Sequence, residues 1–351
     1  MSKTENLLKL LKISYPVIQG AMSGVSTPKM TAGVSNAGGL GSLAVGGLSP
    51  EKTRQLIRET KKYTDKPFAV NLFAHDVPEK FDIPQVNKMQ DFLQAFCKGH
   101  QIPFEIRNAE ELKFYSYEDQ LDILTGEQIT IVSFTFGMLK APVVKALKEN
   151  NCLLAGTATS VQEAIVLENS GVDLVTAQGI EAGGHRGSFL NQDQLPQIGL
   201  MSLVPAIADT IRLPVLAAGG ISDSRGLKAA IALGASGVQV GSIFIAADES
   251  AAVESYKNAV LMAADIDTVV TRAFSGRWAR GLKNAFMEAI GNSGLEIPTY
   301  VIQNYLTSGM RTYAQQNNQK DFISMWAGQS SSKGRRGSTA DIFASLVKDG
   351  W

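Results

Sequence analysis

The chain has 351 residues, of which 44% are hydrophobic, 19% charged and 7% aromatic. This composition is typical of a folded globular protein, so it excludes intrinsic disorder and fibrous architecture for most of the chain. Thirty-three Lys and Arg balance 33 Asp and Glu, so no net charge attracts nucleic acid or an anionic membrane.

The N-terminal residues indicate the cellular compartment, and the cysteines indicate whether disulfides or metal sites are expected. Residues 1–16 are charged and lack the apolar run of a signal peptide, and no apolar stretch reaches the 18 or more residues of a membrane span. Cys97 and Cys152 cannot form a disulfide framework, and no group of residues has metal-ligand spacing. We therefore expect a cytoplasmic protein with no metal, membrane or nucleic-acid partner; the oligomeric state stays open.

Eight short apolar runs follow one another along the chain and are predicted as strands. They are residues 16–19, 40–45, 68–73, 129–134, 153–156, 174–177, 214–218 and 237–240. Most are continuously apolar, as parallel strands covered on both faces are. Amphipathic stretches at 26–37, 142–149, 160–170 and 223–233 predict helices between them. Eight such units predict an α/β fold, a (β/α)8 TIM-type barrel.

The barrel is predicted over residues 1–247, with an insertion at 76–128 after strand three. Beyond residue 247 the strand pattern stops and helical patterns dominate, which predicts a smaller, mostly helical second domain over 248–330. Residues 331–351 are predicted as a C-terminal tail. Within and just before it, the Ser/Gly/Arg-rich stretch 329–339 is expected to be a mobile loop ahead of a last short helix.

Two glycine-bearing turns follow the last two predicted strands. Gly219 and Gly220 come after strand seven, and Gly241 with Ser242 after strand eight. Such turns expose backbone N–H groups, and barrels commonly bind phosphate at this position. The alternative is that these glycines only make tight turns.

Polar side chains also stand at the ends of two other strands. Asn71 lies in an otherwise apolar strand three, and Gln178 lies just past strand six. A buried amide needs a hydrogen-bond partner. A cofactor ring with donor and acceptor edges would provide one, but a loop carbonyl would also do so.

His185 is the strongest candidate for proton chemistry among the three histidines. It lies in the run QGIEAGGHRG at 178–187, between glycines at the mouth of a strand. An imidazole there could take or give a proton near pH 7. His75 is expected to cap a loop, and His100, in the insertion, is expected to be solvated.

Several runs, taken in order, resemble the nitronate monooxygenases, formerly called 2-nitropropane dioxygenases. They are 19–23 (QGAMS), 35–41 (SNAGGLG), 181–187 (EAGGHRG), 217–221 (AAGGI) and 239–242 (QVGS). The stretch from 304–308 (NYLTS) to 325–329 (MWAGQ) is similar to the ending of class I members. The resemblance extends from about residue 7 to residue 329.

The resemblance implies an FMN-binding barrel with a smaller α-rich domain folded over the cofactor. It implies that His185 is the catalytic residue beside the substrate. The residues implied around the flavin are Ala21, Met22, Asn71, Gln178 and Gly183. Those implied at the ribityl phosphate and its turns are Gly219, Gly220, Gln239, Val240, Gly241 and Ser242. Thr135 stands where some class I relatives carry a histidine, so substrate binding can differ. Tyr305 resembles an aromatic pocket residue, although simple packing explains it equally well.

The implied reaction is the FMN-dependent oxidation of an alkyl nitronate with O₂ to a carbonyl compound and nitrite. His185 would hydrogen-bond the nitro oxygens, or remove the α-proton of a neutral nitroalkane. One alternative is an FMN-dependent NAD(P)H reductase of the enoyl-ACP or quinone type, which shares the Gly-Gly-His loop and the phosphate site. Another is a flavin-binding sensor without turnover.

Overall fold

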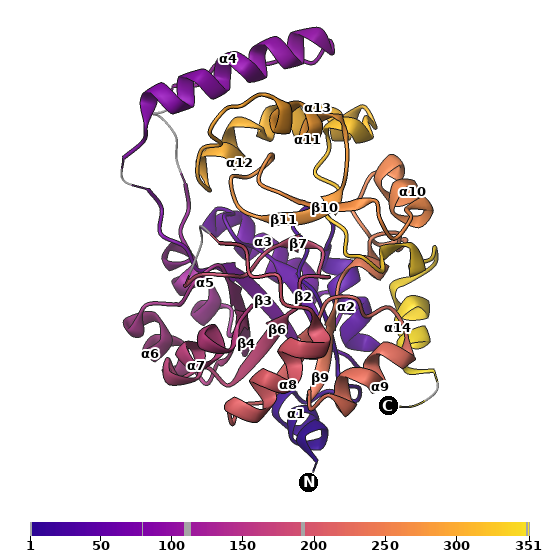
Figure 1. The fold of residues 1–351 in the computed structure, drawn as a ribbon. Helices are drawn as coiled ribbons and strands as arrows, with labels where there is room; N and C mark the ends of the chain where they lie inside the picture. The colour runs from indigo at the N-terminus through magenta and orange to yellow at the C-terminus, as the bar shows by residue number, and fades with distance from the viewer. Residues whose placement is uncertain (1, 79, 109–113, 191–193, 349, 351) are drawn as a thin grey trace.

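The structure is a computed structural model that describes residues 2–78, 80–108, 114–190, 194–348 and 350. Eight parallel strands form one sheet in the order β1-β9-β8-β6-β5-β4-β3-β2. A parallel bridge between Ile18 and Leu40 joins the two ends of this order, which closes the sheet into the predicted TIM-type barrel (Figure 1). The strands are β1 (Val17–Gln19), β2 (Gly41–Ala44), β3 (Phe68–Phe73), β4 (Ile131–Thr135), β5 (Leu153–Ala158), β6 (Leu174–Gln178), β8 (Val215–Ala218) and β9 (Gly237–Val240).

Within the described residues, one helix covers each barrel strand. In chain order these helices are α2 (Pro28–Asn36), α3 (Pro50–Lys61), α5 (Leu121–Gly126), α6 (Ala141–Glu149), α7 (Val161–Asn169), α8 (Leu200–Thr210), α9 (Ser224–Ala232) and α14 (Thr339–Val347). Ser, Thr or Asp side chains start many of them, because such a side chain accepts a hydrogen bond from an unpaired N–H of the first turn. Thr27, Ser49, Ser160, Asp223 and Ser338 do so here.

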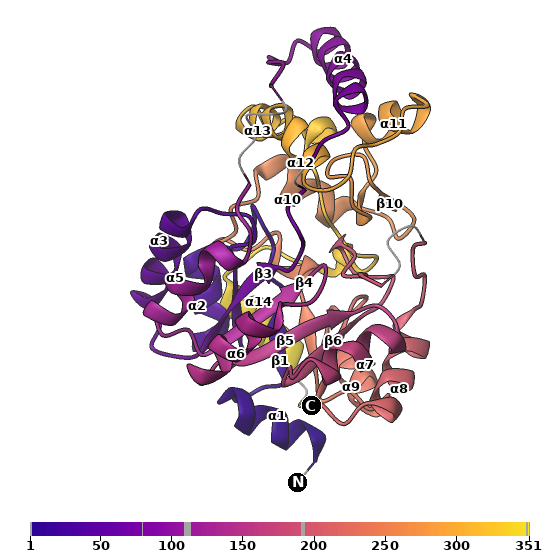
Figure 2. The same ribbon diagram turned by 90° about the vertical axis from the view of Figure 1, so that its left-hand side faces the viewer.

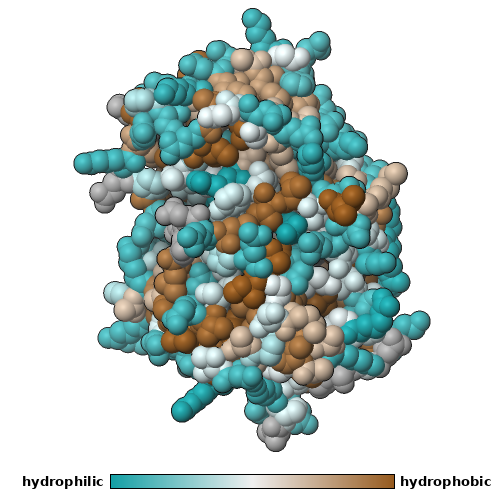
Figure 3. Space-filling view, viewed as in Figure 1, coloured by the Kyte–Doolittle hydropathy of each residue, from teal (hydrophilic) through white to brown (hydrophobic). Residues whose placement is uncertain are grey.

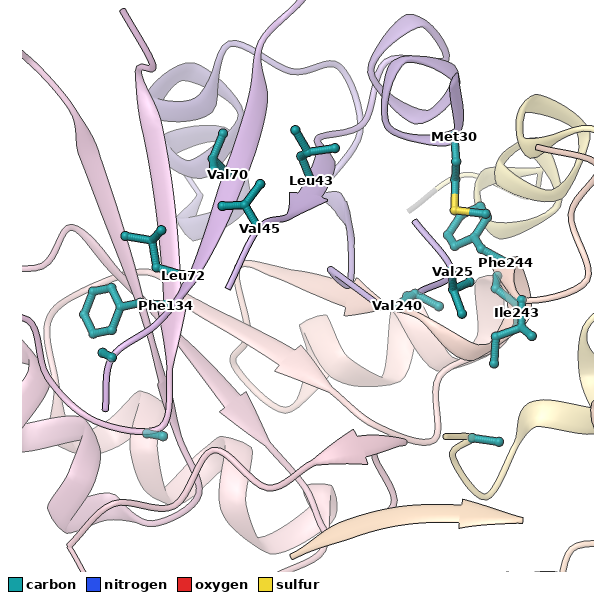
Figure 4. Close-up of a cluster of buried hydrophobic side chains, with 14 of the residues drawn as sticks. Val25, Met30, Leu43, Val45, Val70, Leu72, Phe134, Val240, Ile243 and Phe244 are labelled. Carbon is teal, nitrogen blue, oxygen red and sulfur yellow. The ribbon is translucent and has the colours of Figure 1, made fainter. Parts of the chain in front are cut away.

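The core seals the barrel at one end and leaves the other end open. At the amino ends of the strands, α1 (Lys3–Leu11) places Leu7 and Leu11 against a small buried cluster that includes Ile18 and Leu216. The larger core lies between the strands and the surrounding helices. Figure 4 shows part of it, with Met30 of α2 close to Phe244. A ligand cavity can therefore form only at the carboxyl ends of the strands, where such barrels carry their sites.

A second group of elements lies over the carboxyl ends of the strands, and we call it the upper layer. It consists of α4 (Ile83–Gly99), α11 (Ala285–Asn292), α12 (Ile302–Leu306), α13 (Ser308–Gln316) and a three-stranded sheet. The sheet has the order β10-β11-β7, from β7 (Gly184–His185), β10 (Thr268–Thr271) and β11 (Ala279–Leu282). In both Figure 1 and Figure 2, α4 lies above α11 and α13. The ring of Phe96 on α4 packs 5.4 Å from that of Phe286 on α11.

Two expectations about the C-terminal part are wrong. The strand pattern does not stop at residue 247, because β10 and β11 are strands of four residues, too short for a readable alternation. Residues 329–339 are not a mobile loop: they include the 3₁₀ turn η5 (Ser331–Lys333), and Ser331 is buried. Further 3₁₀ turns are η2 (Glu118–Gln120), η3 (Ser242–Phe244) and η4 (Lys320–Phe322), and α10 (Glu254–Met262) precedes β10.

The last helix belongs to the barrel rather than to a separate tail. Helix α14 packs against α2 and α9, in the position of the helix that should follow β9. Phe343 of α14 is fully buried, with its ring 5.9 Å from that of Tyr15. The upper-layer elements that follow β9 in the chain are thus inserted between β9, the last barrel strand, and α14, the helix that covers it. The domain boundaries at residues 247 and 330 stay a prediction.

None of the helices in the described residues is both long and apolar enough to cross a membrane.

Candidate active site

A cavity of about 520 Å³ lies between the carboxyl ends of the barrel strands and the upper layer. On the face shown in Figure 3, hydrophobic residues gather across the middle of the molecule, between these two parts. Every residue that the sequence analysis assigned to a site lines this cavity: Ala21, Met22, Asn71, Thr135, Gln178, Gly183, His185, Gly219, Gly220, Gln239, Val240, Gly241, Ser242 and Tyr305. They meet because the carboxyl ends of parallel strands share one end of a barrel.

The two glycine-bearing turns form one wall of the cavity. Gly219 and Gly220 have φ values of +124° and +65°, which favour glycine. No hydrogen bond to another described residue engages the backbone N–H of Gly220, Gly241 or Ser242. The C-terminal segment crosses over these turns, since Ser330 Oγ donates to Gly220 O and Gly328 N donates to Ser242 Oγ, each at 2.9 Å. Free N–H groups in a concave turn suit a phosphate.

The two strand-end amides have protein partners of different kinds. Asn71 Nδ2 donates to Ser133 Oγ on the neighbouring strand at 2.9 Å, and its Oδ1 has no partner among the described residues. Gln178 uses both ends of its amide on the loop that carries His185. Its Nε2 donates to His185 O at 2.9 Å, and its Oε1 accepts from Gly187 N at 2.8 Å. Gln178 therefore positions His185 as well as lining the cavity.

His185 lies on β7, a short strand that pairs with β11. Its ring Nε2 is 2.8 Å from Ser275 Oγ, and its Nδ1 has no partner among the described residues. Three aromatic rings surround the imidazole: Trp326 at 5.2 Å, Phe136 at 5.4 Å and Tyr300 at 6.0 Å between centroids. The ring is thus held by packing and by one hydrogen bond.

Burial, together with the smaller effect of the positive charges of Arg277 and Arg311, lowers the pKa of His185 to about 3. A buried imidazolium is costly without a counter-charge. His185 is thus neutral at physiological pH, and its role in a proton exchange near pH 7 stays a prediction. A neutral imidazole can donate one hydrogen bond and accept another, but it is a weak base when its pKa is so low.

Among the described residues that line the cavity, Phe136 is the one non-glycine residue with a positive φ. Its φ is +82°, which a bulky side chain rarely adopts, and such residues concentrate at functional sites. The guanidinium of Arg277 lies 4.3 Å from the centre of its ring. Phe136, His75 and Tyr300 also line a second cavity of about 500 Å³, which holds Arg272 and Arg277. Hence these three rings separate the two cavities.

The other two histidines lie where their sequence surroundings indicate. His75 Nδ1 is 3.3 Å from Phe73 O, and desolvation lowers the pKa of His75 to about 4. His100 is exposed at the end of α4. Only His185 is held between the barrel and the C-terminal loop that carries Ser275.

The sequence model of the nitronate monooxygenase family matches residues 4–349 of the chain. The chain belongs to this family. It is 43% identical over 333 residues to a "probable nitronate monooxygenase" from Staphylococcus saprophyticus, covering 94% of this chain and 93% of the relative. As a member of the nitronate monooxygenase family the chain is an oxidoreductase, as the sequence resemblance implied.

Two solved structures are similar to the whole fold of this family member. The nitroalkane oxidase from Streptomyces ansochromogenes superimposes with a TM-score of 0.88 at 31% identity, covering 97% of this chain and 96% of that one. FabK from Thermotoga maritima superimposes with a TM-score of 0.76 at 28% identity, covering 98% and 95%. The nitroalkane oxidase is therefore the more similar of the two.

The upper layer contributes site residues that the sequence analysis missed. The sequence analysis assigned no role to Ser275, Tyr300, Arg311 or Trp326, although Arg311 and Trp326 lie in the stretch 304–329 that resembles the family, and all four approach His185. For Arg311 a weak signal exists, because Met310 and Ala314 on the same helix are buried and place it near the inner face. A single residue of this kind reaches the site only through tertiary contacts. No spacing pattern in the sequence of this nitronate monooxygenase family member therefore identifies it.

Proposed function

We propose that the protein binds FMN and oxidises alkyl nitronates with O₂ to carbonyl compounds and nitrite. The observation that carries this proposal is that one cavity joins His185 to two glycine-bearing turns whose backbone N–H groups have no partner among the described residues. Family membership and the similarity to a nitroalkane oxidase support the same reaction. When bound, FMN supplies the redox chemistry with O₂.

The cradle for the cofactor phosphate fits a group that approaches the backbone closely. A Cβ on Gly219 would lie 2.9 Å from Ala182 N, and a Cβ on Gly20 would lie 3.4 Å from Gly241 Cα. Gly220, Gly241 and Ser242 would hold the phosphate through their free N–H groups. The residues proposed along the flavin are Ala21, Met22, Asn71, Gln178, Gly183, Gly219, Gln239 and Val240, with Asn71 Oδ1 available to accept a hydrogen bond.

His185 would hydrogen-bond the substrate rather than remove its proton. The single hydroxyl proton of Ser275 can go to His185 Nε2, at 2.8 Å, or to Arg277 O, at 3.2 Å. In the first arrangement Nε2 accepts from Ser275, so the imidazole proton lies on Nδ1. An anion beside Nδ1 favours this arrangement, because Nδ1 can then donate that proton to the anion. Since the imidazole is a weak base, we propose preformed nitronates, not neutral nitroalkanes, as substrates. Thr135 and Tyr305 would line the substrate pocket.

The experiment adds ethylnitronate to the purified protein in air and follows nitrite release and O₂ consumption. Nitrite and acetaldehyde in equal amounts, with no NADH or NADPH needed, support the proposal. The alternative reductase of the enoyl-ACP or quinone type, which the similarity to FabK keeps open, predicts rapid NAD(P)H oxidation by a crotonyl thioester or a quinone. A sensor predicts bound flavin with no product in either assay.

A further inference from the structure

Arg311 is the one formally charged side chain among the described residues that line the main cavity. The remaining lining residues are neutral, and none is Asp, Glu or Lys. A single cation in a cavity of this kind gives the whole site a positive potential. Arg311 and His185 both line this cavity, and the charge of Arg311 lowers the pKa of His185.

Within the part of the chain that the structure describes, the guanidinium of Arg311 has only neutral hydrogen-bond partners. Its Nη2 donates to Asn304 O at 2.5 Å and to Asn304 Oδ1 at 2.9 Å, and its Nε donates to Thr307 Oγ1 at 3.2 Å. Burial lowers the pKa of Arg311 to about 10, so the group stays charged at neutral pH. A buried cation without a carboxylate is costly for the folded protein. An anionic ligand would remove that cost.

The same scaffold positions Arg311 and the imidazole. Thr307 Oγ1, which accepts from Arg311, donates to Phe274 O at 2.6 Å. Phe274 precedes Ser275, which contacts His185 Nε2. Arg311 and His185 are therefore tied to one short loop, so a ligand can meet both at a defined separation.

Tyr300 is a neutral donor on the same side of the cavity. Burial raises the pKa of its hydroxyl, and the charges of Arg277 and Arg311 lower it in part. The hydroxyl has no partner among the described residues, so it can donate to a ligand oxygen. Arg277, the other cation near His185, lines the second cavity and bonds to backbone carbonyls of Phe136 and Ser188.

We propose that Arg311 is the anion-recognition residue of the cavity: it binds the charged oxygens of the ligand and so selects nitronates over their neutral nitroalkane parents. The inference that the anion is a nitronate rests on the proposed function, whereas the inference that Arg311 binds an anion does not. The two N–H groups on Nη1 of Arg311 have no partner among the described residues, so they can donate to the charged oxygens of the ligand. A carboxylate, like a nitronate, carries a negative charge shared by two oxygens on one atom. Binding of a carboxylate therefore reports on the same site without turnover.

The test measures binding of propionate and of neutral propionamide to the FMN-loaded protein by calorimetry. The variants are Arg311→Gln, which keeps a donor but removes the charge, and Arg311→Lys, which keeps the charge. Arg107→Gln is the matched control, because the Arg107 guanidinium lies 4.5 Å from the centre of the Tyr305 ring but does not line the cavity. We expect wild type to bind propionate more tightly than propionamide.

In Arg311→Gln, propionate affinity should fall about 10- to 100-fold, the range for hydrogen bonds to charged groups, with propionamide affinity unchanged. Arg311→Lys should retain most of the preference for propionate, and Arg107→Gln all of it. Equal loss of both ligands in Arg311→Gln would mean that Arg311 acts through packing and would overturn the proposal. A wild-type protein without preference for propionate would overturn it too. Nitrite release by wild type is measured separately, so failure of the proposed reaction is distinguished from failure of anion recognition.

Discussion

His185 Nε2 lies 2.8 Å from Ser275 Oγ, although the two residues are 90 positions apart in the chain. Ser275 is fully buried, and its hydroxyl also lies 3.2 Å from Arg277 O. The contact joins β7, which follows barrel strand β6 in the chain, to the loop that precedes β11. When the Ser275 hydroxyl donates to Nε2, the imidazole proton lies on Nδ1 of His185.

Replacing Ser275 with alanine should lower kcat/KM for ethylnitronate about tenfold or more. The hydroxyl is lost, and the imidazole is left with an unpaired buried nitrogen, which costs about 1–3 kcal/mol. Steady-state kinetics measure the effect, with flavin content and melting temperature as controls for folding. Kinetics equal to those of wild type would show that Ser275 does not position His185.

Acid should destabilise the protein partly through His185. Its pKa is lowered to about 3 in the folded state, whereas an unfolded histidine has a pKa of about 6.5. Between these values the unfolded chain binds a proton that the folded chain does not. The stability from neutral His185 is therefore complete above about pH 6.5 and is lost as the pH falls toward 3, by up to about 1.4 kcal/mol per pH unit.

Urea denaturation of wild type and His185→Asn between pH 7 and pH 4 measures this effect. The variant should lose free energy of unfolding less steeply than wild type. His75, with a pKa lowered to about 4, has the same sign, so His75→Asn serves as a comparison. Parallel pH profiles for wild type and His185→Asn would contradict the burial of a neutral imidazole.

The kinetics of His185→Asn should separate hydrogen bonding from proton removal. If His185 binds the nitronate oxygens, the variant raises KM for ethylnitronate, as expected when ground-state binding is lost. Nitroethane should react slowly with wild type, and its rate should show no inflection near pH 6.5. A strong nitroethane activity that collapses in His185→Asn would instead assign the residue to general-base catalysis.

The flavin released on denaturation should be FMN rather than FAD. The turns after β8 and β9 offer free N–H groups sufficient for one phosphate, and the sequence has no dinucleotide fingerprint for a pyrophosphate. Chromatography of the heat-released flavin decides the question. Release of FAD, or a colourless protein after incubation with FMN, would contradict the assignment.

Gly241→Asp should abolish FMN retention without unfolding the barrel. Gly241 has a φ of −118°, which any residue adopts, and an added Cβ would meet only Met22 Sδ at 3.4 Å. The new carboxylate would repel the phosphate at short range. Gly241→Ala is the matched control and should keep its flavin. If the aspartate variant is fully loaded as purified, the phosphate binds elsewhere.

Much of the fold and the barrel half of the candidate site follow from local patterns in the sequence. Runs such as 153–156 and 214–218 are continuously apolar because both faces of a barrel strand are buried. Gly220, Gly241 and His185 stand just after such runs, and the ends of parallel strands converge on one cavity. Those features need only short-range information, so reading the chain in order was enough to locate them.

Only the tertiary structure decided the rest, because it depends on contacts between distant segments. The sequence pattern assigns no role to Ser275 or Arg311, and each becomes part of the site only when the upper layer covers the barrel. The place of α14 as the last barrel helix depends on contacts such as that between Phe343 and Tyr15, which lie near opposite ends of the chain. The neutral state of His185 likewise follows from burial and from two arginines that lie about a hundred residues away in sequence, since a pKa is set by the assembled surroundings and not by the neighbouring residues.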